Sequence, residues 1–353
     1  MVATLFDRLA ALRVEIEDAS LEGRSLETSY GFERPTTLVV LSGGGAVGIG
    51  EDVTTDVDDQ ARLQANGLPN LAGSYSLAGL LERVDELPFT ADGGEQTDTD
   101  WNRPGQARRW AIESAALDLG LRQARRTLGD QLDRRYDPVS YLVSLRLHEP
   151  TVEPIEAWRA IDPTLEFKLD VTGGWTGEFI DVLSAVDGVR ILDFKRGEEA
   201  MGAALTDPDR YARIVDRFPD VVFEDPRWEP PFAEAFADVH DQISWDGTID
   251  SLAAVEALPF EPRWLNIKPA RFGSLRTLFE VLEWASSNGV SLYGGGMFEL
   301  DRGRSHLHAL ASLFYPDGPN DIAPVAYHVP EPVETGRSSP LAPPEQPGIG
   351  FQA

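Results

Sequence analysis

The sequence predicts an α/β protein: a TIM-type barrel of parallel strands and helices, with a smaller α+β domain in front of it. Seven short apolar runs follow one another between residues 140 and 295, with helical stretches between them. Such alternation indicates parallel βαβ units, and about seven or eight units in sequence favour a closed barrel over an open sheet. The 353 residues exceed one ordinary domain and suffice for a barrel with an additional domain.

The first third of the chain alternates strand and helix signals without a fixed period. Residues 12–20 and 36–53 are predicted strands, the second bent over a Gly-rich turn. Residues 76–87 form an amphipathic helical pattern, and residues 106–132 carry an apolar stripe at helical spacing. We therefore expect an α+β domain over residues 1–135. Within it, residues 20–34 read as a long connection between two strands, and long connections in compact domains are often lids.

Residues 136–328 are expected to form the barrel. Its predicted strands lie at 140–145, 165–171, 188–194, 220–225, 242–246, 263–268 and 289–295. Predicted helices lie between them at 176–186, 209–218, 248–258 and 274–288. Residues 329–353 are rich in Pro and Gly, so we expect a tail without helix or strand, which can still pack on the first domain.

The composition excludes several classes of function. The 59 acidic and 31 basic residues give a net charge of -28, which repels nucleic acid and anionic lipid. No cysteine is present, so disulfides, zinc thiolate sites and thiol catalysis are excluded. No apolar run reaches 18 residues, and no basic region precedes an apolar one at the start. We expect neither a membrane span nor a secretory signal, and a cytoplasmic location. The acidic composition suits a high-salt cytoplasm, where charge repulsion is screened.

Polar residues interrupt the predicted barrel strands near their carboxyl ends, where such barrels carry their active sites. They are Lys168, Asp170, Asp193, Lys195, Glu224, Asp246 and Lys268. From Asp170 onward, the steps to Asp193, Glu224, Asp246 and Lys268 are 23, 31, 22 and 22 residues. Each step is about one βα unit, so these strand ends should lie side by side around one rim. Residues at i and i+2 of a strand share a face, which pairs Lys168 with Asp170 and Asp193 with Lys195.

The chain has only three lysines, and all three fall at these positions. Arginine can replace lysine at most solvated positions, but not where an amine must lose or share a proton. Asp193, Glu224 and Asp246 supply hard oxygen ligands that suit Mg²⁺. For any single acid, a helix cap or a bond to backbone amides is the commoner role. As a set, the residues predict a charged barrel mouth with a metal site.

The motifs on these strands resemble those of the enolase superfamily, in its mandelate racemase and muconate lactonizing (cycloisomerase) branch. They read FKLD, ILDF, FEDP, SWDG and NIKPARFGSL, followed by GGGMFELDRGR. Residues 36–53 and 107–121 resemble the capping domain of that branch and the helix leading into its barrel. The resemblance therefore covers nearly the whole chain, and it is specific as a set, although each motif alone is weak.

This resemblance implies a chemistry and a role for each residue. Asp193, Glu224 and Asp246 would hold Mg²⁺, Lys268 would be the acid/base, and Lys168 would face the metal site as a charge. The reaction would abstract a proton α to a carboxylate, through an enediolate, from a small carboxylate-containing substrate. Residues 1–135 would cap the barrel, with residues 20–34 over its mouth as a substrate-specificity loop. A homo-oligomer is expected.

Two positions depart from the pattern of the branch. Its members often carry Lys-x-Lys on the second strand, where the second lysine is the base on the other face of the substrate, and Asp170 takes that place here. A one-base reaction through Lys268 is therefore favoured, with a lyase (dehydratase) or a cycloisomerase as the result. The alternatives are a racemase or epimerase with Asp170 as second base, and an enolase-like protein that binds a metal or ligand without turnover. Lys195 stands where the family often has Asn, and could bind a second anionic group or neutralise Asp170.

Two further residues are candidates for substrate binding. Glu299 matches an acidic position that the family often has near its last strands, with an acid at a helix start as an equal alternative. Arg271 follows Lys268 by three residues and could bind a substrate carboxylate, although a surface position is the commoner case.

Overall fold

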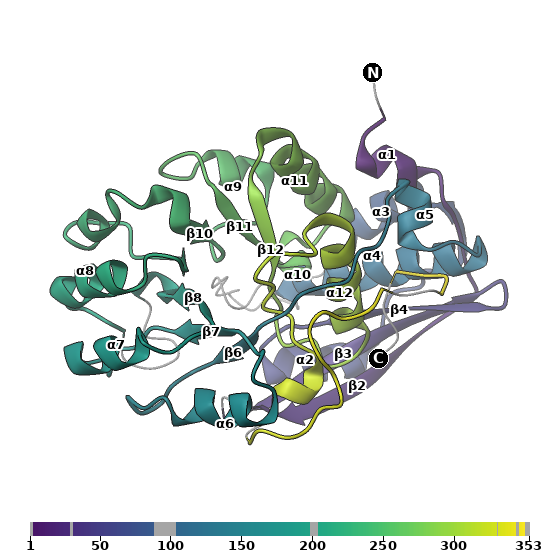
Figure 1. The fold of residues 1–353 in the computed structure, drawn as a ribbon. Coiled ribbons are helices and arrows are strands. Elements are labelled where there is room, and N and C mark those ends of the chain that lie inside the picture. Colours follow the sequence, from purple (N-terminus) through teal and green to yellow (C-terminus); the bar gives the residue numbers. More distant parts are fainter. Residues whose placement is uncertain are drawn as a thin grey trace.

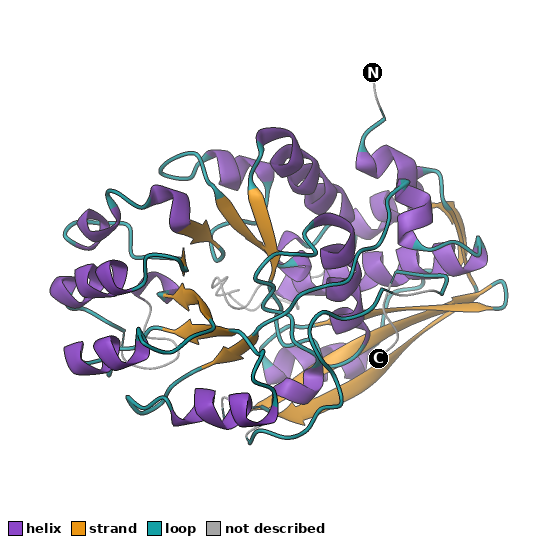
Figure 2. Cartoon of the chain, viewed as in Figure 1, coloured by secondary structure: helices purple, strands orange, loops and turns teal. Residues whose placement is uncertain are grey.

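The computed structural model describes residues 3–28, 31–87, 104–197, 204–329, 331–343 and 346–349. A curled parallel sheet surrounded by helices forms one part of the molecule, and long antiparallel strands with their own helices form the other (Figures 1 and 2). The predicted barrel with an N-terminal α+β domain is therefore confirmed as a fold class. In the described part of the chain, no helix is both long enough and apolar enough to cross a membrane.

The N-terminal domain contains two antiparallel sheets. One pairs β1 (Arg13–Ile16) with β5 (Gly73–Ser76), and the other has the order β2 (Asp18–Glu27), β3 (Glu33–Gly43), β4 (Ala46–Asp52). Its helices are α1 (Leu5–Ala10), α2 (Val57–Asn66), α3 (Leu77–Asp85), α4 (Pro104–Gln123) and α5 (Leu128–Leu132).

Strand β4 lies directly on helix α4, and glycine makes this contact possible. A Cβ atom at Gly50 would overlap the carbonyl oxygen of Ala111, and one at Gly48 would overlap the backbone at Ala115 and Leu119. The Gly-rich run of the sequence therefore serves close packing of a strand on a helix. The predicted turn within it is the Gly44 and Gly45 pair, where both residues have positive φ angles of 55° and 75°.

Two local predictions in this domain are corrected. Residues 20–34 are mostly a hairpin, because β2 continues to Glu27 and β3 begins at Glu33. Thr28 N donates to Phe32 O (3.0 Å) between the two strands, and residues 29 and 30 lie outside the described part of the chain. The helical stripe at 106–132 is interrupted: Arg125 has a φ of 55°, and Thr127 begins a new helix with a capping box to Asp130. The apolar period continued across the break, so periodicity alone did not show it.

The barrel sheet has seven strands in the order in which they occur along the chain, all parallel to their neighbours. They are β6 (Val143–Leu145), β7 (Phe167–Asp170), β8 (Val189–Asp193), β9 (Val222–Glu224), β10 (Ile243–Trp245), β11 (Trp264–Ile267) and β12 (Ser291–Gly294). Each lies within one of the seven predicted runs. The two edges of the sheet are joined by the segment after α12, where Asp321 N donates to Gly294 O (2.8 Å) and Leu142 N donates to Asn320 O (2.9 Å).

Helices follow the strands on the outside of the sheet, as Figure 2 shows. They are α6 (Glu153–Ile161), α7 (Gly177–Leu183), α8 (Pro208–Arg217), α9 (Leu252–Glu256), α10 (Pro269–Phe272), α11 (Leu275–Asn288) and α12 (Arg302–Phe314). Short 3₁₀ turns lie at η1 (Lys195–Gly197), η2 (Phe232–Phe236), η3 (His240–Gln242) and η4 (Val325–Tyr327). Because helices cover one face of the sheet and the barrel interior fills the other, its strands are buried on both faces.

The C-terminal tail returns to the first domain. Val139 and Leu341 form an antiparallel bridge, and Ile349 N donates to Asp118 Oδ1 of α4 (2.9 Å). Residues 330, 344–345 and 350–353 of this tail lie outside the described part of the chain.

The two domains are joined by buried polar contacts. Glu51 of β4 accepts hydrogen bonds from the backbone N–H groups of Leu300, Asp301 and Gly303, at 2.6 to 3.0 Å. On the other side of the joint, Glu113 of α4 accepts from Leu275 N at the start of α11 (2.7 Å). Both carboxyl groups therefore cap the start of a barrel helix from the N-terminal domain.

We predict that Gly50→Ala lowers the free energy of unfolding by about 2 to 3 kcal/mol, because the new methyl group forces β4 away from α4. Chemical denaturation monitored by circular dichroism measures it. Gly177→Ala is the matched control, since a Cβ there meets only the Arg213 side chain at 3.5 Å, an ordinary contact. An equal effect of both substitutions would show that the close approach at Gly50 is unimportant.

A second prediction concerns the pH dependence of stability. Burial raises the pKa of Glu113 from 4.5 to about 7, although the Arg109 guanidinium and Leu275 N–H act in the opposite direction. Because the folded-state pKa exceeds the unfolded one, the stabilising contribution of Glu113 is complete below pH 4.5 and is lost as the pH rises through about 7. It amounts to at most about 3 kcal/mol.

Glu113→Gln should therefore gain stability relative to the wild type as the pH rises from about 5 to 8. Denaturant titrations at several pH values measure the difference, and Glu280→Gln on the exposed side of α11 serves as control. A difference between wild type and Glu113→Gln that does not change with pH would contradict the prediction.

Candidate active site

The predicted polar residues meet at the carboxyl ends of the barrel strands. Strands β7, β8 and β9 end at Asp170, Asp193 and Glu224, while Asp246 and Lys268 directly follow β10 and β11. The parallel register places Asp170 beside Asp193, and Asp193 beside Glu224. All five side chains are buried. The short polar ends of buried strands thus assemble one charged cluster at the mouth of the barrel.

Lys168 lies in the middle of this cluster. Its Nζ is 2.6 Å from Glu224 Oε1, 2.9 Å from Asp193 Oδ2 and 3.3 Å from Asp321 Oδ2, and its side chain is 1% exposed. Burial by itself would lower the pKa of this amine, but the neighbouring carboxylates of Asp193 and Glu224 outweigh burial and raise it well above its usual value. Lys168 is therefore the internal counter-ion of two predicted metal ligands.

Glu224 is held from several sides. Tyr293 OH donates to Oε2 (2.6 Å) and Asn266 Nδ2 donates to Oε1 (3.2 Å), in addition to Lys168. Burial, together with the nearby charge of Asp193, raises the pKa of Glu224 to about 8. The hydroxyl of Ser244 lies 2.8 Å from Tyr293 OH and extends this chain of hydrogen bonds into the barrel interior.

Asp246 is paired with two cations. Lys268 Nζ is 2.7 Å from Oδ2, and the Arg271 guanidinium contacts Oδ1 and also donates to the backbone carbonyl of Asp246 (2.5 Å). Burial opposes the charged form, but Arg271 and Lys268 outweigh it and hold the pKa of Asp246 below its usual value. Arg271, predicted as a candidate for substrate binding, thus belongs to the cluster and orients a predicted metal ligand in this structure.

Asp170 lies between two cations as well. Arg146 Nη2 is 2.7 Å from its Oδ2, and Lys195 Nζ is 3.2 Å from its Oδ1. Lys195 also contacts Asp193 with its ammonium group and with its backbone N–H (3.0 Å). Asp193 and Lys195 are in contact as predicted, but they do not share a strand face, because β8 ends at Asp193. A turn with left-handed Lys195 and Arg196, at φ angles of 50° and 53°, brings the lysine back.

The contacts of Glu299 are with residues outside the charged cluster. Its carboxylate accepts from Met297 N (3.0 and 3.1 Å) and lies 3.6 Å from Arg304 Nη2, and the side chain is 4% exposed. In the described structure Glu299 thus supports the loop between β12 and α12, next to the domain joint at Glu51.

Four residues of the cluster were missed from the sequence: Arg146, Asn266, Tyr293 and Asp321. Asn266 precedes Lys268 by two residues on β11, so the rule that paired Lys168 with Asp170 could have found it. Arg146 follows β6 directly and carried the same strand-end signal. Tyr293 lies within an apolar run, and Asp321 lies in a segment without a predicted element, so neither gave a local signal.

The predicted metal ligands agree with Mg²⁺ in donor type. Asp193, Glu224 and Asp246 offer buried carboxylate oxygens at three adjacent strand ends. Among the described residues, however, no group of three or more His, Cys, Asp or Glu side chains is arranged to hold a metal ion. A lysine ammonium group contacts each of the three carboxylates instead, and the Arg271 guanidinium also contacts Asp246. The residues fit Mg²⁺ if such an ion takes over the role of these internal cations.

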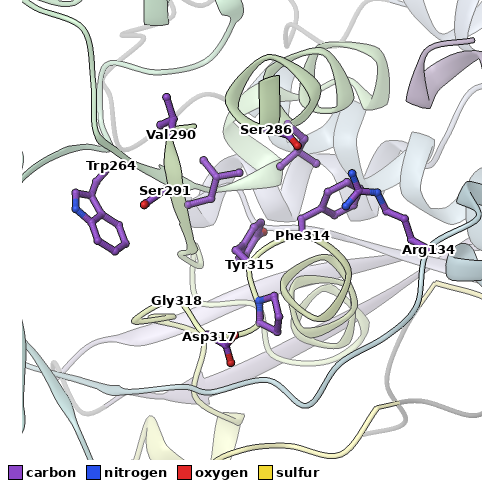
Figure 3. A pocket seen from close by; sticks show the side chains of 12 residues that line it. Arg134, Trp264, Ser286, Val290, Ser291, Phe314, Tyr315, Asp317 and Gly318 are labelled. Atoms are coloured by element: carbon purple, nitrogen blue, oxygen red, sulfur yellow. The ribbon is translucent and has the colours of Figure 1, made fainter. Parts of the chain in front are cut away.

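A separate pocket of about 420 Å³ lies at the other end of the strands. Trp264 and Ser291, the first residues of β11 and β12, line it together with Arg134, Phe314 and Tyr315 (Figure 3). It contains none of the predicted site residues. The charged cluster at the carboxyl ends therefore remains the candidate active site.

Several solved structures share this fold. A dipeptide epimerase from Enterococcus faecalis superimposes with a TM-score of 0.70 at 17% identity, covering 96% of this chain and 100% of the other. A muconate cycloisomerase variant gives 0.67 at 18%, covering 95% and 96%. A dipeptide epimerase from Methylococcus capsulatus, in complex with a Mg ion, gives 0.65 at 18%, covering 96% and 99%.

Two characterised sequences are also similar to this chain. The chain is 25% identical over 339 residues to an N-succinylamino acid racemase from Thermus thermophilus, covering 90% of this chain and 86% of that protein. An N-succinylamino acid racemase from an Amycolatopsis species is 27% identical over 217 residues, 58% of this chain and 56% of that protein.

These similarities agree with the predicted resemblance to enolase-superfamily enzymes of the branch that contains muconate cycloisomerases. Residues 135–329 match the C-terminal domain, and residues 7–131 the N-terminal domain, of a family described as domain of unknown function DUF8230. The chain belongs to this family.

The central position of Lys168 leads to a prediction about stability. Lys168→Met should lower the free energy of unfolding by about 3 kcal/mol in the presence of a chelator, because it leaves Glu224 and Asp193 buried without their shared counter-ion. Denaturant titration measures the change. Arg190→Met removes an exposed positive charge from β8 and should cost less than about 1 kcal/mol. A variant as stable as the wild type would show that Lys168 is dispensable for burying the cluster.

Proposed function

We propose that this protein catalyses the Mg²⁺-dependent abstraction of a proton α to a carboxylate of a small substrate, as a lyase (dehydratase) or a cycloisomerase. The observation that carries the proposal is the position of Lys268. It is a buried amine at the end of β11, beside Asp246, in the same row as Asp193 and Glu224. A base beside hard oxygen ligands is what this type of proton abstraction requires.

Each residue has a definite task in the proposed reaction. Asp193, Glu224 and Asp246 would hold the Mg²⁺, which supplies positive charge for the oxygen anion that develops on the substrate carboxylate. Lys268 takes the α-proton at its Nζ in the neutral amine form, after it has released the proton that it carries beside Asp246, and Lys168 presents a positive charge next to Glu224 and Asp193. Arg271 holds Asp246 in place from the other oxygen. The burial of these groups excludes water and strengthens their electrostatic interactions.

The partners of Asp170 support a reaction with one base. Arg146 and Lys195 both contact this carboxylate, so it is held as a counter-ion to two cations and is not directed at a substrate. An enzyme that inverts a stereocentre needs an acid or base on each face of the substrate. Elimination or ring closure needs only the one that Lys268 provides.

Racemisation or epimerisation remains the second candidate, because the similar characterised sequences are named N-succinylamino acid racemases. The names of the relatives and structural neighbours also guide the choice of substrates. N-succinylamino acids, dipeptides and muconate-like acids all carry carboxylates, so a panel of these compounds with hydroxy acids is the rational first screen.

We predict that Lys268→Met reduces Mg²⁺-dependent exchange of the substrate α-proton by about 10² to 10⁴-fold, because it removes the base. Proton NMR in deuterated water with the acid panel measures exchange. The control is Mg²⁺ binding by calorimetry, which should persist in Lys268→Met and be lost in Glu224→Gln. Exchange at the wild-type rate in Lys268→Met would refute the assignment of the base.

The same spectra separate the candidate functions. Loss of water or formation of a ring identifies a lyase or a cycloisomerase, and deuterium at an inverted centre identifies a racemase or epimerase. Absence of exchange with every acid of the panel, despite Mg²⁺ binding, would favour a protein that binds without turnover.

A further inference from the structure

Lys195 holds Asp193 through two contacts. Its backbone N–H donates to Oδ1 (3.0 Å), and its ammonium group contacts Oδ2. The turn that makes this possible has left-handed φ angles at Lys195 and Arg196, a region that residues with side chains seldom adopt. Unfavourable backbone conformations of this kind cluster at functional sites. Both oxygens of one predicted metal ligand are thereby occupied by a single residue.

A second carboxylate lies within reach of the same ammonium group. Asp170 Oδ1 is 3.2 Å from Lys195 Nζ, yet this buried oxygen accepts no hydrogen bond among the described residues. The other oxygen of Asp170 is fixed by Arg146 (2.7 Å). Asp170 is thus oriented toward Lys195 and has an unused acceptor, so a small movement of the ammonium would exchange Asp193 for Asp170 without leaving a buried charge unpaired.

Lys195 is also the lysine best placed to move. Its side chain is 16% exposed, compared with 1% for Lys168 and 6% for Lys268. Lys168 is held by three carboxylates and lies deeper in the barrel. Of the two ammonium groups on Asp193, the one from Lys195 is therefore the more exposed and the less deeply buried in the barrel.

We propose that Lys195 sets the affinity of the site for its divalent cation. Its ammonium group neutralises Asp193 before the cation binds, and transfers to Asp170 when the cation takes its place. Asp170, which stands where relatives often have a base, then serves as the counter-ion that receives Lys195. This inference rests on the proposed function, because it concerns the same Mg²⁺ site.

Calorimetric titration of the full-length, metal-stripped protein with Mg²⁺ at constant ionic strength tests the proposal. Lys195→Met should bind Mg²⁺ at least about tenfold more tightly than the wild type, because one competing positive charge is gone. Asp170→Asn should bind more weakly than the wild type, because the displaced ammonium has lost its second partner. The double variant should bind like Lys195→Met.

Arg190→Met is the matched control, since it removes one positive charge from β8 away from the site and should change the affinity less than about twofold. Lys195→Asn provides a second variant should Lys195→Met fail to fold, and circular dichroism verifies folding. Equal or weaker Mg²⁺ binding by folded Lys195 variants would overturn the inference and leave the proposed function intact. Absence of Mg²⁺ binding in the wild type and all variants would overturn both.

Discussion

The ion pairs buried at the strand ends are the interaction on which the rest of the site depends. Carboxylates at Asp170, Asp193, Glu224 and Asp246 lose their hydration at the barrel mouth, and a buried charge without a partner is strongly destabilising. In the structure, each of these carboxylates contacts at least one cationic side chain. Lys168 bridges two acids, Lys195 bridges two, and Lys268 and Arg271 share Asp246. The arrangement fixes the side chains before any ligand arrives, which is the preorganisation that proton abstraction requires.

The N-terminal domain supports the site by holding the loop between β12 and α12. Glu51 gives its two oxygens to three backbone N–H groups at the end of the β12 to α12 loop. Arg34 of β3 donates to the carbonyl of Met297 in that loop (2.8 Å), and the rings of Phe32 and Phe298 pack edge to face at 5.6 Å. The loop that borders the mouth beyond β12 is therefore held by the hairpin of the other domain, as a loop without regular structure needs to be.

Much of the fold could be predicted because the barrel repeats one local rule. Each of the seven apolar runs became a parallel strand, and the strands from β7 to β11 end at, or directly before, the polar residue that interrupts the run. Predictions failed where a turn or a cap decided the outcome. The hairpin at residues 20–34 depends on cross-strand pairing. The break between α4 and α5 depends on the cap at Thr127 and a left-handed Arg125, and the apolar period of the sequence continues across it.

The sequence by itself determined that the polar residues predicted at the strand ends meet at the mouth, because the spacing of one βα unit brings successive strand ends to one rim and the chain places its three lysines only there. Only the tertiary structure decided what these charges do to each other. Which ammonium contacts which carboxylate depends on side chains from distant segments, such as Arg146, Tyr293 and Asp321. The return of Lys195 to Asp193 depends on a left-handed turn beyond the strand. Coulombic interactions depend on distances in space, whereas the periodicity of the sequence reflects only neighbours along the chain. The sequence pattern therefore predicted where the cluster lies, and the fold decided which charges are paired.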